Sequence, residues 1–273
     1  MCQLLGMNCN VPTDIQFSFR GFRQRSGITG EHGDGFGIGF FEGRGCRVFL
    51  DRQAACQSPV AQLLDHYAIK SLNVIAHIRK ATQGEVKLEN CHPFQRELWG
   101  EYWLFAHNGD LKNLPAGFGR GHYYRPVGDT DSEQAFCHLL ERLRQRFSQP
   151  PDVAAMFPVV AEWAAELAQH GTFNFMLSNG RWLITHCSSK LSYLIRQAPF
   201  HTAHLLDEDV EIDFSTVTTP ADRVAVIATE PLTDNEAWTP ILPGQLLLFE
   251  AGEVRLSHLP EKMPVPTTMQ RED

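Results

Sequence analysis

The sequence lacks any apolar run that approaches the roughly 20 residues a membrane-spanning helix requires. It also lacks a basic start followed by an apolar segment, because the N-terminus is already polar at Asn8, so we expect no signal peptide. No dense run of Lys or Arg offsets the formal net charge of −8, which argues against a nucleic-acid-binding surface. These absences predict a cytoplasmic protein that binds neither membranes nor nucleic acids.

The seven cysteines contain no CxxC pair and are scattered along the chain. Without an export signal, this pattern predicts reduced thiols, most of which pack in the interior. The only close pair among the twelve histidines is His201 and His204, and no carboxylate accompanies it at a metal-ligand spacing. We therefore expect no metal and no cofactor. A histidine-based metalloprotein remains an alternative, which elemental analysis would reveal.

What the chain does contain is a series of strands, then a helical block, then more strands. The predicted strands are residues 2–5, 35–41, 46–50, 72–78, 103–106, 173–177, 182–186, 191–195, 223–228, 245–249 and 254–256. The predicted helices are residues 59–67, 128–147 and 152–170. Thr130 and Glu133 fit a capping box at the start of the second helix, and Asn179-Gly180 is typical of a hairpin turn.

This order of elements predicts an α+β fold with mainly antiparallel sheets, and two stacked sheets covered by helices would accommodate it. There is no internal repeat or linker, so we predict a single domain over residues 1–260 and a mobile tail over 261–273. Residues 21–39 are rich in glycine and basic residues and predict an ordered loop. Alternate glycines in the following strand leave one face bare, which favours either close approach of a backbone or ligand, or tight packing of the sheet.

The first stretch that could carry chemistry is Met1-Cys2-Gln3-Leu4-Leu5. If Met1 is removed, Cys2 carries both a thiol and a free α-amine. Unperturbed, these groups titrate near about 8.5 and about 7.8, so the amine can accept the thiol proton. This is the N-terminal-nucleophile form of covalent catalysis. The simpler alternative is an accidental cysteine at a frayed terminus.

Acyl transfer through a thioester needs donors for the developing oxyanion and groups that orient the substrate. Asn108 and Gly109 offer a side-chain amide and an unobstructed N–H, although most Asn-Gly pairs only form turns. Arg79 follows an apolar strand and could bind a carboxylate, or it could form an internal salt bridge. Asp131 could receive an ammonium group, or it could serve only to cap a helix. Together they describe a zwitterionic amino acid whose side-chain carbonyl faces a thiol, such as glutamine or another γ-glutamyl compound.

In this order along the chain, the motifs resemble the glutamine-hydrolysing domain of class II, N-terminal-nucleophile glutamine amidotransferases. The matching segments are Cys2, DGFG at residues 34–37, HIRKATQG at 77–84, NCHPF at 90–94, HNG at 107–109 and TDSE at 130–133. The likeness spans nearly the whole chain and is closest to short, stand-alone bacterial proteins of the YafJ type. It implies the four-layer αββα sandwich of N-terminal-nucleophile hydrolases.

The resemblance also implies a role for each matching residue. Cys2 would be the nucleophile and its α-amine the base, while Asn108 and Gly109 would form the oxyanion hole. Arg79 would bind the substrate carboxylate and Asp131 its ammonium group. The substrate-binding loop would also include Lys80 and Thr82, and it would close over glutamine. The chain departs from the common family pattern at Gln3, Lys80 and Gln83.

We therefore expect an amidohydrolase that cleaves a γ-glutamyl amide through Cys2 and releases glutamate. It could act alone or as a subunit that supplies ammonia to a separate synthase. The departures at Lys80 and Gln83 keep open an alternative from another class, a non-catalytic binding or regulatory module that takes a glutamine-like ligand. The expected partners are a small γ-glutamyl substrate and, for a subunit, that synthase.

Overall fold

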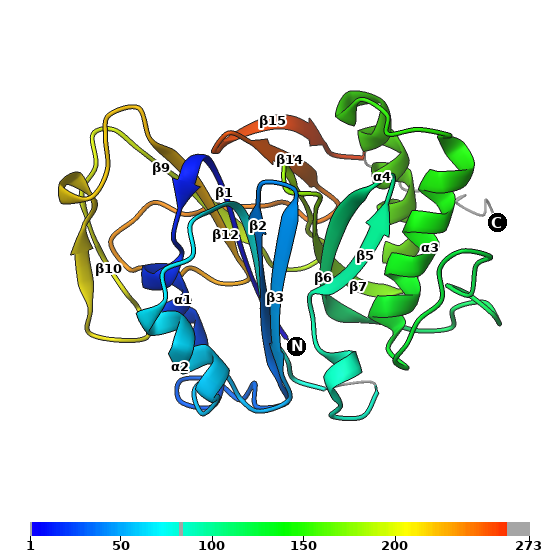
Figure 1. Ribbon diagram of the computed structural model, residues 1–273, viewed down its shortest axis with the longest axis horizontal. Coiled ribbons are helices and arrows are strands. Elements are labelled where there is room, and N and C mark those ends of the chain that lie inside the picture. Colours follow the sequence, from blue (N-terminus) through cyan, green and yellow to red (C-terminus); the bar gives the residue numbers. More distant parts are fainter. Residues whose placement is uncertain (1, 82–83, 261–273) are drawn as a thin grey trace, which may run out of the picture.

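The computed structural model describes residues 2–81 and 84–260, which fold into two large β-sheets with helices on their outer faces (Figure 1). In spatial order, the strands of the seven-stranded sheet are β13 (Thr239–Pro240), β9 (Ser192–Gln197), β12 (Arg223–Ala228), β1 (Gln3–Thr13), β4 (Ser71–Ile78), β2 (Phe36–Glu42) and β3 (Gly45–Asp51). Those of the six-stranded sheet are β15 (Glu253–His258), β14 (Leu246–Glu250), β8 (Leu183–His186), β7 (Gly171–Ser178), β6 (Glu101–Leu111) and β5 (Phe94–Leu98). Neighbouring strands in both sheets are antiparallel.

The remaining elements lie outside the two large sheets. They are the helices α1 (Gln16–Gln24), α2 (Pro59–His66), α3 (Asp131–Arg146) and α4 (Val153–Ala168), the short 3-10 helices η1 (Leu88–Asn90) and η2 (Phe214–Thr216), and the ribbon of β10 (Thr202–His204) and β11 (Glu211–Asp213). Helices α1 and α2 cover one sheet, and α3 and α4 cover the other (Figure 1).

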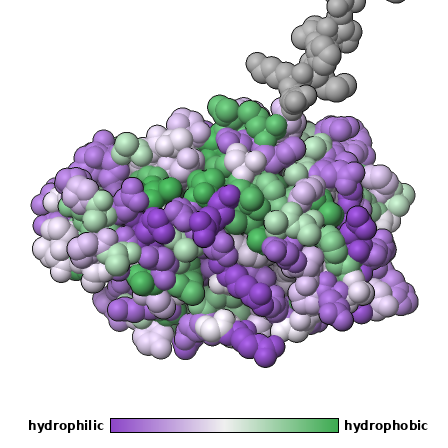
Figure 2. Space-filling model, turned by 90° about the horizontal axis from the view of Figure 1, so that it is seen from above, coloured by the Kyte–Doolittle hydropathy of each residue, from purple (hydrophilic) through white to green (hydrophobic). Residues whose placement is uncertain are grey.

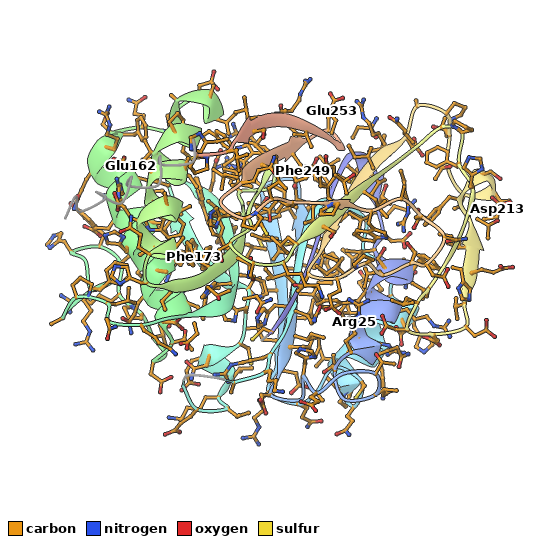
Figure 3. All side chains as sticks on the ribbon, turned by 180° about the vertical axis from the view of Figure 1, so that it is seen from behind. Arg25, Glu162, Phe173, Asp213, Phe249 and Glu253 are labelled. Atoms are coloured by element: carbon orange, nitrogen blue, oxygen red, sulfur yellow. The ribbon has the colours of Figure 1, made fainter. Side chains whose placement is uncertain are left out.

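Three hydrophobic clusters correspond to the three boundaries between layers. One joins α3 and α4 to the six-stranded sheet, and it includes Phe173, which Figure 3 labels beside these helices. A second joins α1 and α2 to the seven-stranded sheet. The third, which contains Leu4, Leu104 and Phe249, lies between the two sheets. The order helix, sheet, sheet, helix confirms the predicted α+β sandwich.

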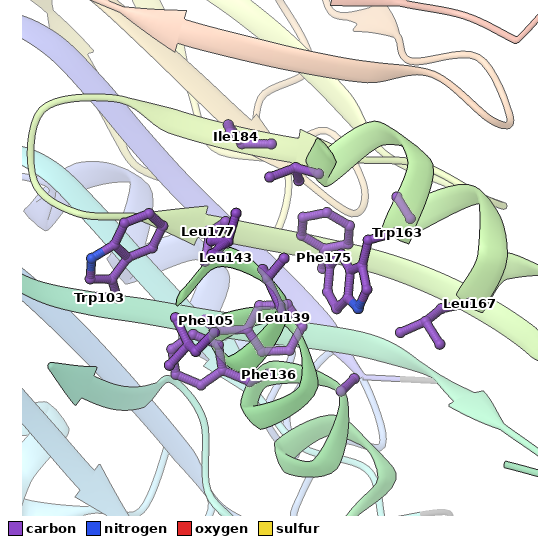
Figure 4. Close-up of a cluster of buried hydrophobic side chains, with 14 of the residues drawn as sticks. Trp103, Phe105, Phe136, Leu139, Leu143, Trp163, Leu167, Phe175, Leu177 and Ile184 are labelled. Atoms are coloured by element: carbon purple, nitrogen blue, oxygen red, sulfur yellow. The ribbon is translucent and has the colours of Figure 1, made fainter. Parts of the chain in front are cut away.

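Helix α3 begins where the sequence predicts it. The side chain of Thr130 accepts a hydrogen bond from the Glu133 N–H at 3.2 Å, while the Glu133 carboxylate accepts the Gly128 N–H at 2.7 Å. The predicted capping box therefore forms only in part, because the Glu133 carboxylate accepts from the N–H of Gly128 and not from that of the capping residue Thr130. The apolar face of α3 packs against Phe105 and against Trp163 of α4 (Figure 4).

Two predictions near the N-terminus are wrong in detail. Residues 16–24 form α1, whose last residues fall in the loop predicted from residue 21, and Phe19 and Phe22 are buried three residues apart on one helical face. Strand β1 continues to Thr13 through a stretch predicted to be a loop. The buried Asn8 is tolerated there because its side-chain amide donates to Asn73 Oδ1 at 2.9 Å.

The alternate glycines of β2 serve close packing between the sheets. A Cβ at Gly37 would lie 2.2 Å from the His92 carbonyl oxygen, and one at Gly39 would lie 2.4 Å from Leu104 Cδ1. A real Cβ cannot approach other atoms so closely, and at Gly37 the obstacle is backbone. The structure therefore supports both interpretations of this strand, since another backbone approaches closely at Gly37 and the sheets pack tightly at Gly39.

Polar and apolar side chains are interspersed on the face shown in Figure 2. Within residues 2–81 and 84–260, no helix combines the length and the apolar character needed to cross a bilayer. The predicted tail over residues 261–273 lies outside the described residues.

We predict that Gly37→Ala lowers the free energy of unfolding by about 2 kcal/mol or more, because the added methyl group must displace the His92 backbone. Gly33→Ala is the matched control, since no atom lies within 4 Å of a Cβ at that position. Its effect should stay below about 0.5 kcal/mol. Urea denaturation of both variants measures the difference, and equal stabilities would contradict the packing argument.

Candidate active site

The alternation of side chains along the strands directs three of the predicted site residues into the layer between the sheets. Leu4 pairs with His77, and Leu4 belongs to the inter-sheet cluster together with Leu104 and Ala106. Successive residues of a strand point to opposite faces, so every second residue shares a face. Cys2 lies two residues from Leu4, Arg79 two from His77, and Asn108 two from Ala106. Asn108 therefore points into this layer, and we expect Cys2 and Arg79, each one residue outside its strand, to continue the same alternation.

Cys2 is buried at the start of β1, against the backbone of Lys80. Its Sγ accepts a hydrogen bond from the Lys80 N–H at 3.3 Å, and the thiol donates to the Lys80 carbonyl at 3.3 Å. Burial raises the pKa of the Cys2 thiol, and the Lys80 N–H and the Arg79 guanidinium offset this only in part. A buried thiol with a raised pKa is neutral, so a reaction through its sulfur needs an adjacent base.

The Asn108 side chain meets β1 through Thr229, the residue directly after β12. Thr229 Oγ1 accepts a hydrogen bond from the Leu4 N–H at 2.9 Å and lies 3.5 Å from the Asn108 amide nitrogen. The Thr229 N–H in turn donates to the Leu4 carbonyl at 3.0 Å. Thr229 thus connects the segment that carries Cys2 with the predicted oxyanion donor.

Gly109 follows at the same end of β6. A Cβ there would lie 1.8 Å from the Thr172 carbonyl oxygen, so only glycine fits against β7. On β7, Asn174 donates from its side chain to the Asn108 carbonyl at 3.1 Å. Most Asn-Gly pairs form turns. This pair instead lies within strand β6.

Arg79 is buried and its guanidinium contacts backbone carbonyls. It donates to the Glu85 carbonyl at 2.9 Å and to the Gly84 carbonyl at 3.2 Å. The backbone N–H of Arg79 donates to the Gly35 carbonyl at 2.8 Å. This bond connects the DGFG segment to Arg79. In the contacts with Glu85 and Gly84, the guanidinium donates to a backbone carbonyl.

Asp131 is buried in the first turn of α3. Its carboxylate accepts the Leu111 N–H at 2.8 Å, a contact that joins the helix start to the end of β6. The charges of Arg79 and Asp131 both act on the pKa of Cys2, the first lowering it and the second raising it. The guanidinium and the carboxylate are therefore both within electrostatic range of the thiol, as the predicted site for a zwitterionic amino acid requires.

Unlike the buried side chains of Cys2, Arg79, Asn108 and Asp131, the side chain of Lys80 is partly exposed. Its backbone contacts Cys2, but its side chain leads outward, and its Nζ pairs with the Glu31 carboxylate at 2.6 Å. Thr82 and Gln83 lie outside the described residues.

Sequence reasoning missed Thr229 and gave no role to Asn90. Thr229 follows a predicted strand in the same way that Arg79 and Asn108 do, so the rule that polar residues at strand ends form sites would have found it. Asn90 lies in the NCHPF segment, and one of its partners, Asp129, is 39 positions away in the sequence. Within the part of the chain that the structure describes, no three His, Cys, Asp or Glu side chains group as a metal site requires.

Several buried histidines surround the site and are held neutral. Burial lowers the pKa of His77 to about 3 and of His186 to about 4, and it also lowers the pKa of His92 and His107. The rings of His77 and His92 lie 4.2 Å apart between their centroids. His107 Nε2 donates to the Thr172 carbonyl at 3.1 Å, beside the Gly109 contact.

Similarity to known proteins defines the class to which this protein belongs. The profile of the class II glutamine amidotransferases matches residues 1–272. The chain belongs to this family.

Individual relatives agree with the family assignment. A Haemophilus influenzae protein, assigned as a glutamine amidotransferase, is 57% identical over 253 residues, which cover 93% of this chain and 85% of that protein. YafJ of Escherichia coli K12, with the same assignment, is 56% identical over 257 residues, covering 93% and 99%. The 2.0 Å crystal structure of a predicted glutamine amidotransferase from Pseudomonas aeruginosa aligns with a TM-score of 0.74 at 47% identity, covering 93% and 99%. They confirm the resemblance stated from the motifs.

The buried histidines predict a loss of stability in mild acid. Each has a folded-state pKa below its unfolded value near 6.5. The neutral ring therefore makes its full contribution to the free energy of unfolding when the pH is above that value. This contribution is lost as the pH falls toward the folded-state pKa, which is about 3 for His77. Between pH 7 and about pH 5.5, the free energy of unfolding should fall by about 1 kcal/mol for each of His77 and His186, whose pKa values are lowered to about 3 and about 4. Urea denaturation at the two pH values measures this, and a His77→Gln variant should show a smaller fall than the wild type.

Proposed function

We propose that this protein hydrolyses a γ-glutamyl amide, glutamine or a γ-glutamyl conjugate, through a thioester on Cys2. The observation that carries the proposal is that Cys2, Arg79 and Asp131 are all buried, with Cys2 bonded to the backbone next to Arg79 and Asp131 bonded to the end of the strand that carries Asn108. Membership in the class II glutamine amidotransferases supports the same substrate class.

The amino-acid head of the substrate would lie between two opposite charges. The Arg79 guanidinium suits an α-carboxylate because its planar donors match two oxygens. Asp131, at the other side, suits the α-ammonium group. Binding both groups would direct the γ-carbonyl toward the sulfur and convert the attack into an intramolecular step.

In the proposed reaction, Cys2 carries a free α-amine once Met1 has been removed. The amine takes the thiol proton, and the sulfur attacks the γ-carbonyl carbon. The Asn108 amide and the Gly109 N–H would donate to the oxyanion that forms. As the C–N bond breaks, the α-ammonium group returns the proton to the leaving amine, which leaves as ammonia or an amine. Water, deprotonated by the same α-amine, then hydrolyses the thioester to glutamate and the thiol.

The environment of Cys2 fits this use of an adjacent amine. Burial favours the neutral thiol, so the sulfur stays protonated until a base within the same residue accepts the proton. The buried histidines are poor candidates for that base, because their lowered pKa values make them weak proton acceptors. Thr229 would keep Asn108 close to the N-terminal strand during the reaction.

Replacing the nucleophile tests the proposal directly. Cys2→Ala should reduce glutamate release from glutamine, or from a γ-glutamyl amide found by mass-spectrometric screening, by at least about 10³-fold. Cys9→Ala is a matched control on the same strand, because its thiol contacts the Ser71 carbonyl and lies outside the proposed site. Undiminished turnover in Cys2→Ala would exclude the mechanism. A wild-type protein that binds such compounds without turnover would support the non-catalytic alternative.

The two halves of the site should separate in steady-state kinetics. Asn108→Ala removes a donor used in the transition state, so kcat should fall about 10²–10³-fold with little change in KM. Asp131→Asn keeps an oxygen for the Leu111 N–H but loses the charge, so its main effect should be a KM raised about tenfold or more. Equal effects of both substitutions on kcat would argue against the assigned roles.

A further inference from the structure

The side chain of Asn90 is fully buried and every hydrogen-bonding group of its amide has a partner. Its Nδ2 donates to the Glu85 carbonyl at 2.9 Å and to the Asp129 carboxylate at 2.6 Å. Its Oδ1 accepts the Asp129 N–H at 3.1 Å. The amide therefore joins the segment at Glu85, five positions away, to the segment at Asp129, 39 positions away. Each of its polar atoms has a partner.

The first of these segments holds Arg79. The Glu85 carbonyl that accepts from Asn90 also accepts from the Arg79 guanidinium at 2.9 Å, and the neighbouring Gly84 carbonyl accepts from it at 3.2 Å. Two carbonyl groups therefore orient the guanidinium, and Asn90 fixes one of them. Because a planar guanidinium binds a carboxylate only in a defined direction, a shift of this carbonyl would turn the fork away from its target.

The second segment leads into α3. Asp129 precedes the capping residue Thr130, and Asp131 follows as the first residue of the helix. Close packing reinforces the contact, because a Cβ on Gly128 would lie 2.1 Å from Asn90 Oδ1 and one on Gly84 would lie 2.6 Å from Asp129 Oδ1. Movement at Asn90 would therefore be transmitted to the start of the helix that carries Asp131.

We infer that Asn90 is a positioning residue that sets the spacing between Arg79 and Asp131, the two charges that would hold the head of the substrate. The inference rests on the proposed function and adds to it a residue outside the reacting groups. The partners of the Asn90 side chain are Glu85 and Asp129. Cys2 is held by the β1–β4 pairing, and Asn108 by β6, β7 and Thr229. Loss of Asn90 should thus weaken recognition of the amino-acid head while the reacting groups keep their arrangement.

The kinetic test compares Asn90→Ala with Glu89→Ala, an exposed neighbour in the same short helix. Asn90→Ala should raise KM for the γ-glutamyl substrate about tenfold and change kcat less than about threefold. Gly128→Ala, which pushes on the same amide from the other side, should raise KM in the same direction if Asn90→Ala does not fold. Glu89→Ala should behave as the wild type.

Two thiol reagents separate head recognition from a general loosening of the site. Diazo-oxo-norleucine carries the amino-acid head and alkylates the thiol with loss of nitrogen gas, whereas iodoacetamide has no such head and loses iodide. Peptide mapping follows the modification of Cys2 alone. In Asn90→Ala, the half-saturating concentration of the diazo compound should rise about tenfold, and the rate with iodoacetamide should stay within about twofold of the wild type.

The outcomes distinguish this inference from the proposed function. If the diazo compound saturates Asn90→Ala as it does the wild type, or if both reagents slow equally, the positioning role is overturned and the proposed nucleophile stands. If the wild-type protein forms no Cys2 adduct with the diazo compound, the proposed function fails first.

Discussion

The antiparallel pairing of β1 with β4 is the constraint on which the site depends. It sets Gln3 opposite Ile78 and Leu4 opposite His77, so Cys2 is brought beside the residues that follow β4. A shift of this register by one residue would exchange the two faces of the strand and turn the Cys2 side chain away from the second sheet. Leu4 and Leu5 are both fully buried, on opposite faces of the sheet. Such a shift would therefore also disrupt the packing of the two hydrophobic clusters to which they belong.

The two sheets contribute different parts of the proposed chemistry. The seven-stranded sheet supplies Cys2, Arg79 and Thr229, and the six-stranded sheet supplies Asn108 and Gly109. Helix α3 adds Asp131 from the outer layer, through its contact with the end of β6. Close packing of the sheets at Gly37 and Gly39 is therefore a requirement of the site as well as of stability. A rigid arrangement of this kind can hold reacting groups more exactly than a site made of loops alone.

Much of the site could be predicted because polar residues directly follow apolar strands, as Arg79 does and as Asn108 does within its strand. Strong periodicity likewise predicted α3. Helix α1 was missed because the glycine and basic residues from residue 21 onward favour a loop, although Phe19 and Phe22 are spaced to share one helical face. The partners of Asn90 lie up to 39 positions away, and local pattern carries no information about them. The side chain of Lys80 forms an ion pair with Glu31, which its place next to Arg79 could not indicate.

The central claim is that the sulfur of a residue with a free α-amine becomes acylated by the substrate. Rapid acid quenching of the protein with isotopically labelled γ-glutamyl substrate, followed by peptide mapping, tests it most directly. The account predicts label on a peptide that begins at Cys2, with Met1 absent. Glutamate release with label on another residue, or with Met1 retained on the active protein, would contradict it.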